Sequence, residues 1–252
     1  MTRLAQLLSI RQGEGRMSSL VIGVMLSTSV GAALGSTGIE ALFFARFGVE
    51  YLPYMFLGLG ITTMVMSFGV SALLSRVPRQ ILYLVIPLLV AIILVLARLA
   101  LFSEEDWLYP ALWLGKEVVN ILITLAIWGM AAAVCDTRQA KRLFPLFNAS
   151  RILGQVIGGF ATGLLVASIG TENLLLVWAG TLLIAFALSR LLLQRAQFSS
   201  TSKGKKSRRR QTRLIQEMQR GYHYVRSSPL MKWIAISTIF FSILFFSLSL
   251  PF

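Results

Sequence analysis

Four polar residues recur at helical spacing in an apolar stretch near the middle of the chain. They are Glu117, Asn120, Thr124 and Trp128. Steps of three, four and four residues place such side chains on one face of an α-helix. An ionisable group is costly in hydrocarbon unless it faces a bundle interior or an aqueous cavity, so this polar stripe predicts a cavity for a polar solute. A structural ion pair or hydrogen bond to another helix is the alternative interpretation of Glu117.

Two further ionisable residues belong to the same candidate site. Lys116 precedes Glu117 and lies about 100° around the helix from it, so we do not expect these neighbours to pair. We expect Lys116 to extend toward the outer end of its segment, which is within about two turns. Glu40 follows Ser36 by four residues and is either a cavity residue or an interfacial one, with Arg46 as its partner or as a head-group anchor.

The remaining residue types provide no catalytic or metal-binding pattern. Cys135 is the single cysteine and His223 the single histidine, so neither an intrachain disulfide nor a paired metal-ligand motif is available. The sequence has no nucleophile elbow, no phosphate-binding loop and no dinucleotide fingerprint. We therefore expect a protein that is not an enzyme and that needs no metal or cofactor.

Long apolar segments carry these residues. Of the 252 residues, 56% are hydrophobic and 13% are charged, which is too apolar for one soluble core. Seven segments have about the 20 residues that cross a bilayer as a helix. They are 18–44, 51–74, 81–102, 108–134, 146–169, 174–193 and 233–252. We predict an all-α, polytopic transmembrane bundle of six helices, plus a seventh helix at which the sequence stops.

The distribution of Lys and Arg predicts the orientation. These residues accumulate in short cytoplasmic loops, and here they lie before the first segment, between the second and third, and between the fourth and fifth. The other connections contain few cations. We predict an integral protein of a bacterial inner membrane with a cytoplasmic N-terminus. Its parts are the N-terminus 1–17, the bundle 18–193, a cytoplasmic connector 194–232 and the seventh segment 233–252.

Much of the net charge of +14 lies in the connector, which includes Lys203, Lys205, Lys206 and the three arginines 208–210. Beyond them, apolar residues at helical spacing predict an amphipathic helix on the membrane surface. These residues are Leu214, Met218, Tyr222 and Val225. Contact with anionic lipids is compatible with this charge. No aromatic platform accompanies it, so we do not expect nucleic acid as a partner.

Pairs of glycines predict close helix packing. Small residues four positions apart let membrane helices approach each other. The pairs are Gly31 with Gly35, Gly154 with Gly158, and Gly159 with Gly163. We expect the first and fifth segments to have tight neighbours.

The order of the elements resembles the first half of a major-facilitator transporter, in which two six-helix halves enclose a site near the membrane midplane. The usual motif of that superfamily between its second and third helices is Gly-x-x-x-Asp-Arg-x-Gly-Arg. Its places are taken here by Ser71, Ser75, Arg76, Pro78 and Arg79. This departure from the motif argues against a typical drug or sugar facilitator.

Residues 109–159 resemble the bacterial and plastid ATP/ADP translocase family. The fourth span of that family carries a Glu and a Leu-Phe-Trp segment, and a loop reading Glu-Ala-Lys-Arg-Phe-Tyr-Pro-Leu-Phe-Gly follows. The corresponding residues here are Glu117, the segment 126–128 and the segment 139–148. Gln139 replaces an acidic residue of the motif, and Asn148 replaces its last glycine.

The resemblance implies an alternating-access carrier for a nucleotide such as ATP or ADP, or for another organic anion. It implies that Glu117 lies in the cavity and that Lys141, Arg142 and Arg151 lie in the cytoplasmic loop. The expected partners are the bilayer, a small solute, and the second half of the same protein or a second copy. The rival interpretation is a membrane anchor, scaffold or sensor that keeps this fold without transport. It predicts that partner helices fill the polar face of the fourth segment.

Overall fold

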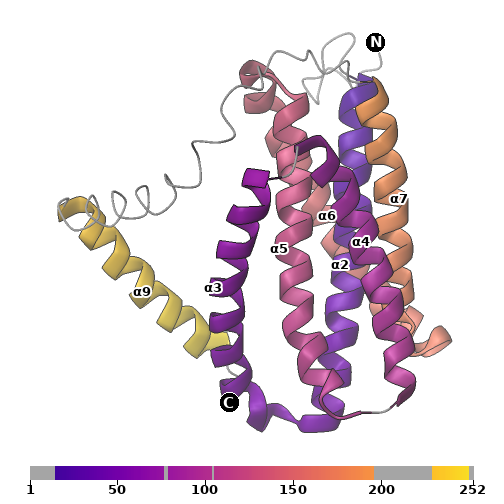
Figure 1. Cartoon of the computed structure of the whole chain (residues 1–252), viewed down its shortest axis with the longest axis vertical. Coiled ribbons are helices and arrows are strands. Elements are labelled where there is room, and N and C mark those ends of the chain that lie inside the picture. Colours follow the sequence, from indigo (N-terminus) through magenta and orange to yellow (C-terminus); the bar gives the residue numbers. More distant parts are fainter. Residues whose placement is uncertain (1–14, 77–78, 104, 196–228, 250–252) are drawn as a thin grey trace. The chain divides into compact units, whose positions relative to one another are not determined.

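The computed structural model describes residues 15–76, 79–103, 105–195 and 229–249. They belong to two compact units, Met1–Ser200 and Thr201–Phe252. The described residues are almost entirely helical, and they contain no strand. The prediction of an all-α protein is therefore confirmed for this part of the chain (Figure 1).

The described part of the first unit contains six long helices. They are α2 (Gly15–Phe47), α3 (Leu52–Arg76), α4 (Arg79–Ala100), α5 (Leu108–Val134), α6 (Thr137–Ile169) and α7 (Leu174–Arg195). Two short 3-10 helices, η1 (Val49–Tyr51) and η2 (Leu101–Ser103), follow α2 and α4. All six long helices are long and apolar enough to cross a bilayer, since a span needs about 20 residues. The chain is therefore an integral membrane protein.

The fifth span begins earlier than its sequence predicts. Residues 137–145 were expected to lie in a loop, but they form the first turns of α6. Asp136 and Gln139 form a capping box, in which the Asp136 backbone N–H donates to Gln139 Oε1 at 3.0 Å. Such a cap satisfies backbone donors at a helix start. The more polar residues 137–145 therefore form the beginning of α6, and the apolar residues of the predicted span follow in the same helix. Pro145 lies inside the helix.

Helix α2 packs closely against α7. A Cβ atom at Gly31 would overlap the side chain of Thr181, and one at Gly35 would overlap the indole ring of Trp178. Trp178 is fully buried. The prediction of a tight neighbour for the first span is confirmed, because only the missing side chains leave room for this contact.

Helix α6 packs against α2 through the second glycine pair. A Cβ atom at Gly154 would lie 2.7 Å from the Leu26 carbonyl oxygen, and one at Gly158 would lie 2.7 Å from the Val30 carbonyl oxygen. The expected tight neighbour of the fifth span is therefore α2. No described atom lies within 4 Å of a Cβ built at Gly159 or at Gly163, so the third pair forms no such contact in the described part of the chain.

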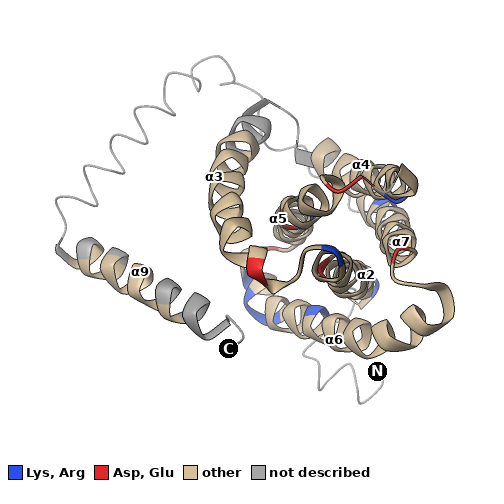
Figure 2. Ribbon diagram, turned by 90° about the horizontal axis from the view of Figure 1, so that it is seen from below, with Lys and Arg blue, Asp and Glu red and all other residues tan. Residues whose placement is uncertain are grey.

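The cation-poor connections lie together at one end of the bundle, as Figure 2 shows from below. There, Arg46 Nε pairs with Asp106 Oδ1 at 2.7 Å, and Arg98 Nη2 of α4 pairs with Glu172 Oε2 at 3.1 Å. These pairs link connections that are distant in sequence. Cation-poor and cation-rich connections thus lie at opposite ends of the bundle, as predicted. The side of the membrane that each end faces stays a prediction.

The second unit is described by one helix, α9 (Pro229–Ser249). It covers most of the predicted seventh segment, and its membrane insertion stays a prediction. Several other predictions concern residues that lie outside the described ones. They are the N-terminal residues 1–14, most of the basic connector with its amphipathic helix, and the last residues, 250–252.

Candidate functional site

A cavity of 410 Å³ lies between α2, α5 and α6. Helix α5 contributes Asn120, Thr124 and Trp128 to its wall, all members of the predicted polar stripe. Helix α2 contributes residues that include Thr28, Ser29, Ser36, Thr37 and Glu40, and α6 contributes Arg151 and Gln155. Four of the six predicted cavity residues thus line one hollow, whereas Glu117 and Lys116, which were also predicted there, are not in its wall.

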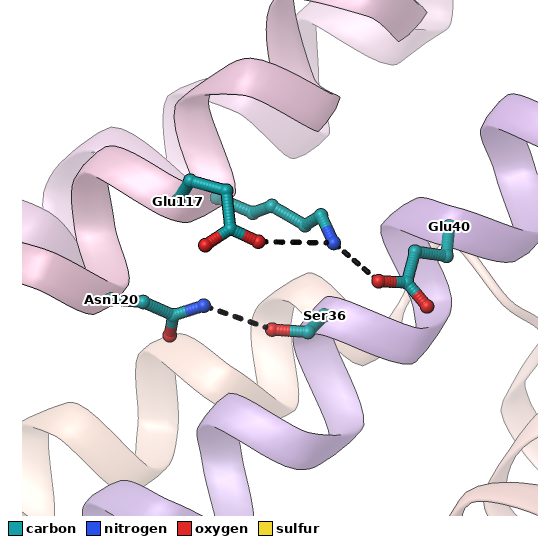
Figure 3. Close-up of polar contacts among 5 residues, drawn as sticks. Ser36, Glu40, Glu117 and Asn120 are labelled. Carbon is teal, nitrogen blue, oxygen red and sulfur yellow. Dashed lines mark hydrogen bonds and ion pairs between the residues drawn. The ribbon is translucent and has the colours of Figure 1, made fainter. Parts of the chain in front are cut away.

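Beside the cavity, the Lys116 ammonium lies between the carboxylates of Glu40 and Glu117, which Figure 3 labels. Its Nζ atom pairs with Glu40 Oε1 of α2 and, at 3.3 Å, with Glu117 Oε1. The lysine side chain is 4% exposed, whereas those of Glu40 and Glu117 are 44% and 34% exposed. The cluster therefore joins α2 to α5 and carries one more negative than positive charge.

Two predictions about Lys116 were wrong. Its side chain is buried and paired inside the bundle rather than exposed at the outer end, and it pairs with the adjacent Glu117. A backbone offset of about 100° does not prevent this contact, because the long lysine stem is flexible. A buried ammonium is costly without a partner, so Lys116 turns toward the nearest carboxylates.

Aromatic rings border this cluster. Lys116 Nζ lies 5.0 Å from the centre of the Trp113 ring, at the distance of a cation–π contact. Trp113 also contacts Phe43 of α2 and Phe56 of α3. Apolar rings reduce the local dielectric constant, which strengthens the attraction between Lys116 and its carboxylates.

A second polar link connects α2 and α5 one helical turn away. Asn120 Nδ2 donates to Ser36 Oγ at 3.4 Å (Figure 3), which is long for a hydrogen bond. Ser36 and Glu40 are four residues apart on α2, as Lys116 and Asn120 are on α5. The two links therefore form successive contacts along the same pair of helix faces.

Arg151 does not lie in a loop, which corrects the prediction made from the family resemblance. It stands 14 residues after the start of α6, roughly 20 Å along the helix, and lines the cavity with Gln155. Arg151 Nε donates to Asn148 Oδ1 at 3.3 Å. Gln155 was not predicted as a cavity residue, although its position four residues after Arg151 indicates a shared face.

The other two residues of the predicted loop motif lie elsewhere. Lys141 is exposed and Arg142 is half-buried, both in the first turns of α6. Neither lines the cavity. Among the described residues of the cavity wall, Arg151 is therefore the cation, and Glu40 is the acid.

The polar stripe also borders open space outside the cavity. A second hollow of 510 Å³ runs along α5 and is lined by the stripe residues Asn120, Thr124 and Trp128 together with apolar neighbours. Thr124 is exposed in the described chain. The stripe thus also borders open space at the edge of the described bundle.

Comparison with protein-family models, with curated proteins and with solved structures finds no match. The class of protein is accordingly the one that the fold itself defines, a polytopic α-helical membrane protein with six apolar spans in the described residues. The resemblances to major-facilitator transporters and to ATP/ADP translocases stay predictions.

Proposed function

We propose that this chain is part of a secondary carrier of the major-facilitator type. It binds a small organic anion between α2, α5 and α6 and exposes this solute alternately to the two sides of the membrane. The observation that carries the proposal is the 410 Å³ cavity, whose wall includes Glu40, Asn120 and Arg151. Polar groups within spanning helices are expensive unless they serve a solute pathway or a structural bond.

The rival function, a non-transporting anchor, scaffold or sensor, predicts a polar stripe that is packed by neighbouring helices. Lys116 fits that description because it is buried and paired. Asn120 and Thr124 fit it less well, since both border empty space and Asn120 makes one long hydrogen bond. Unused hydrogen-bonding capacity beside a cavity favours a solute-binding role.

The charge of the cavity bears on the choice of anion. A nucleotide such as ATP or ADP is the candidate from the family resemblance, and it carries several negative charges. Arg151 is the cation among the described residues of the wall. A polyanion therefore requires further cations from the second half of the protein or from a second copy, placed against the open side of α5.

The test is uptake of radiolabelled ATP and ADP by proteoliposomes that contain the full-length protein. We expect saturable uptake, which Glu117→Gln abolishes because this change removes one of the two carboxylates that hold Lys116. The matched control is Glu105→Gln, which makes the same change at an exposed connection and should leave uptake intact.

Two negative results have different meanings. If folded protein takes up neither nucleotide but does take up a smaller organic anion, the nucleotide assignment fails and the carrier remains. If it takes up no member of a panel of nucleotides, dicarboxylates and phosphate esters, the carrier proposal fails and the scaffold function gains support.

A further inference from the structure

The cavity has two chemically different ends. Gly154 of α6 lies against Leu26 of α2, so Arg151, one turn earlier, is beside the part of α2 that includes Met25, which also lines the cavity. Glu40 lines it 15 residues farther along α2, roughly 22 Å at the rise of an α-helix. The cation and the acid thus stand at opposite ends.

Arg151 has no carboxylate partner among the described residues, unlike the cations that the structure places in ion pairs. Arg46, Arg98 and Lys116 each contact a carboxylate, whereas the contact that Arg151 makes is with the neutral amide of Asn148. No carboxylate pairs with Arg151 among the described residues. A guanidinium inside a membrane-spanning helix is costly without a counter-charge, so its position beside a cavity indicates a ligand that supplies one.

Asn148 orients this guanidinium. Its side-chain oxygen accepts from Arg151 Nε at 3.3 Å, which leaves the two Nη groups for another partner. A guanidinium presents paired N–H donors that match the oxygens of a phosphate or carboxylate. Gln155 lines the cavity one turn farther along α6 and adds an amide donor on the same face.

We infer that Arg151, oriented by Asn148, binds the phosphate or carboxylate group of the transported solute at the cavity end remote from Glu40. This inference rests on the proposed carrier function and adds the orientation of the solute. The opposite end disfavours an anion, because Glu40 lines the cavity there and the adjacent Lys116 is shared with a second carboxylate, that of Glu117. The neutral or cationic part of the solute therefore points toward Glu40.

The first experiment measures anion binding without transport. The full-length protein in neutral detergent is heated in sodium pyrophosphate, sodium malonate or sodium chloride at equal ionic strength, and its unfolding temperature is recorded. We expect saturable stabilisation by pyrophosphate or malonate beyond that by chloride. Arg151→Gln should remove it, and Arg151→Lys should weaken it about tenfold, because a lysine lacks the paired donors of the guanidinium.

Two further variants make the test specific. Asn148→Ala keeps the charge and should raise the half-saturating anion concentration by a few-fold, because Arg151 loses its orienting bond. Arg138→Gln is the matched control, since it removes an exposed arginine from the first turn of the same helix. It should leave anion stabilisation unchanged.

Three outcomes of the stabilisation experiment would overturn the inference. One is the absence of stabilisation by either soluble anion, and another is stabilisation that persists in both Arg151 variants. The third is stabilisation by phosphatidylglycerol alone that Arg151→Gln removes, which would assign the site to a lipid head group. The uptake assay separates this inference from the carrier proposal. If anions bind through Arg151 but no uptake occurs, the carrier proposal fails and the anion site stands. If the Arg151→Gln variant retains full uptake, the anion site fails and the carrier proposal stands.

Discussion

The two sides of α2 contact their neighbours in different ways. Toward α7, Gly31 and Gly35 leave their space to Thr181 and Trp178, so backbone and ring are in direct contact. Toward α5, the helix uses polar side chains, among them the ion pair of Glu40 with Lys116. One helix thus belongs both to a close-packed interface and to the wall of a cavity.

This difference shows how a membrane bundle can combine stability with an internal cavity. Lipid tails are as apolar as side chains, so helices in a bilayer associate through close van der Waals packing and hydrogen bonds rather than through the hydrophobic effect. The α2–α7 contact provides the packing, and the α2–α5 contact leaves room for a solute. We therefore expect substitutions of the packed glycines to act on stability, and substitutions on the second side to act on function as well as on stability.

Gly35→Leu should have the largest effect on stability. The new side chain would overlap the buried ring of Trp178, and overpacking costs about 1–3 kcal/mol or more. We expect the free energy of unfolding in mixed detergent to fall by about 3 kcal/mol, the upper end of that range. Gly159→Leu is the control, because no described atom surrounds that glycine within 4 Å. Equal losses in the two variants would contradict the distinction between the two glycines.

Lys116→Met should have the next largest effect, on the cavity side. It leaves Glu40 and Glu117 without their shared cation, and loss of one partner of a fully buried ion pair costs about 3–5 kcal/mol. Both carboxylates are partly exposed, so we expect about 1–3 kcal/mol in thermal unfolding. Adding Glu40→Gln should restore part of the loss. A double variant less stable than the single one would show that Glu40 stabilises the bundle without Lys116.

Two ion pairs away from the α2–α5 contact, those of Arg98 and Arg46, allow a comparison of a buried and an exposed polar link. Arg98 is 12% exposed and contacts Glu172, Asn173 and the Phe102 ring. We expect Arg98→Gln to cost about 1–2 kcal/mol of unfolding free energy, since bonds to charged groups are stronger than neutral ones. Arg46→Gln, at an exposed ion pair, should cost at most about 1 kcal/mol. An equal cost for both variants would mean that burial does not strengthen the Arg98 contacts.

Ser36→Ala should change stability least. Its bond with Asn120 is 3.4 Å long, so its loss should cost less than about 0.5 kcal/mol, the low end for a hydrogen bond. The same change at exposed Ser67 of α3 is the stability control. If the cavity binds solute, Ser36→Ala alone should raise the half-saturating solute concentration in the uptake assay. A large loss of stability would show that the second polar link holds α2 and α5 together.

The resemblance to the translocase motif is easier to interpret with the structure. Gln139, which departs from the motif, keeps the reciprocal bond of a capping box with Asp136. Asn148, the other departure, bonds to Arg151. The two residues that depart from the motif thus have roles of their own here: Gln139 caps the start of α6, and Asn148 orients a cavity residue. A motif match predicted neither role, because both depend on contacts that the helix makes once it has formed.

The sequence by itself determined the helices and several of their faces. Apolar length located the six spans, since a bilayer needs about 20 residues per helix. Spacing placed Asn120 and Thr124 on one face, and glycine pairs indicated where α2 and α6 pack closely. These signals are local, because helical geometry relates residues a few positions apart.

Only the tertiary structure decided which groups meet between helices. It paired Lys116 with Glu40, placed Arg151 on a cavity wall and left Gly159 without a described neighbour. The pairing depends on the depth and rotation of each helix and on side-chain conformers, none of which helical periodicity specifies. A buried ammonium then takes the partner that packing brings within reach, because remaining unpaired costs more than any conformer it must adopt.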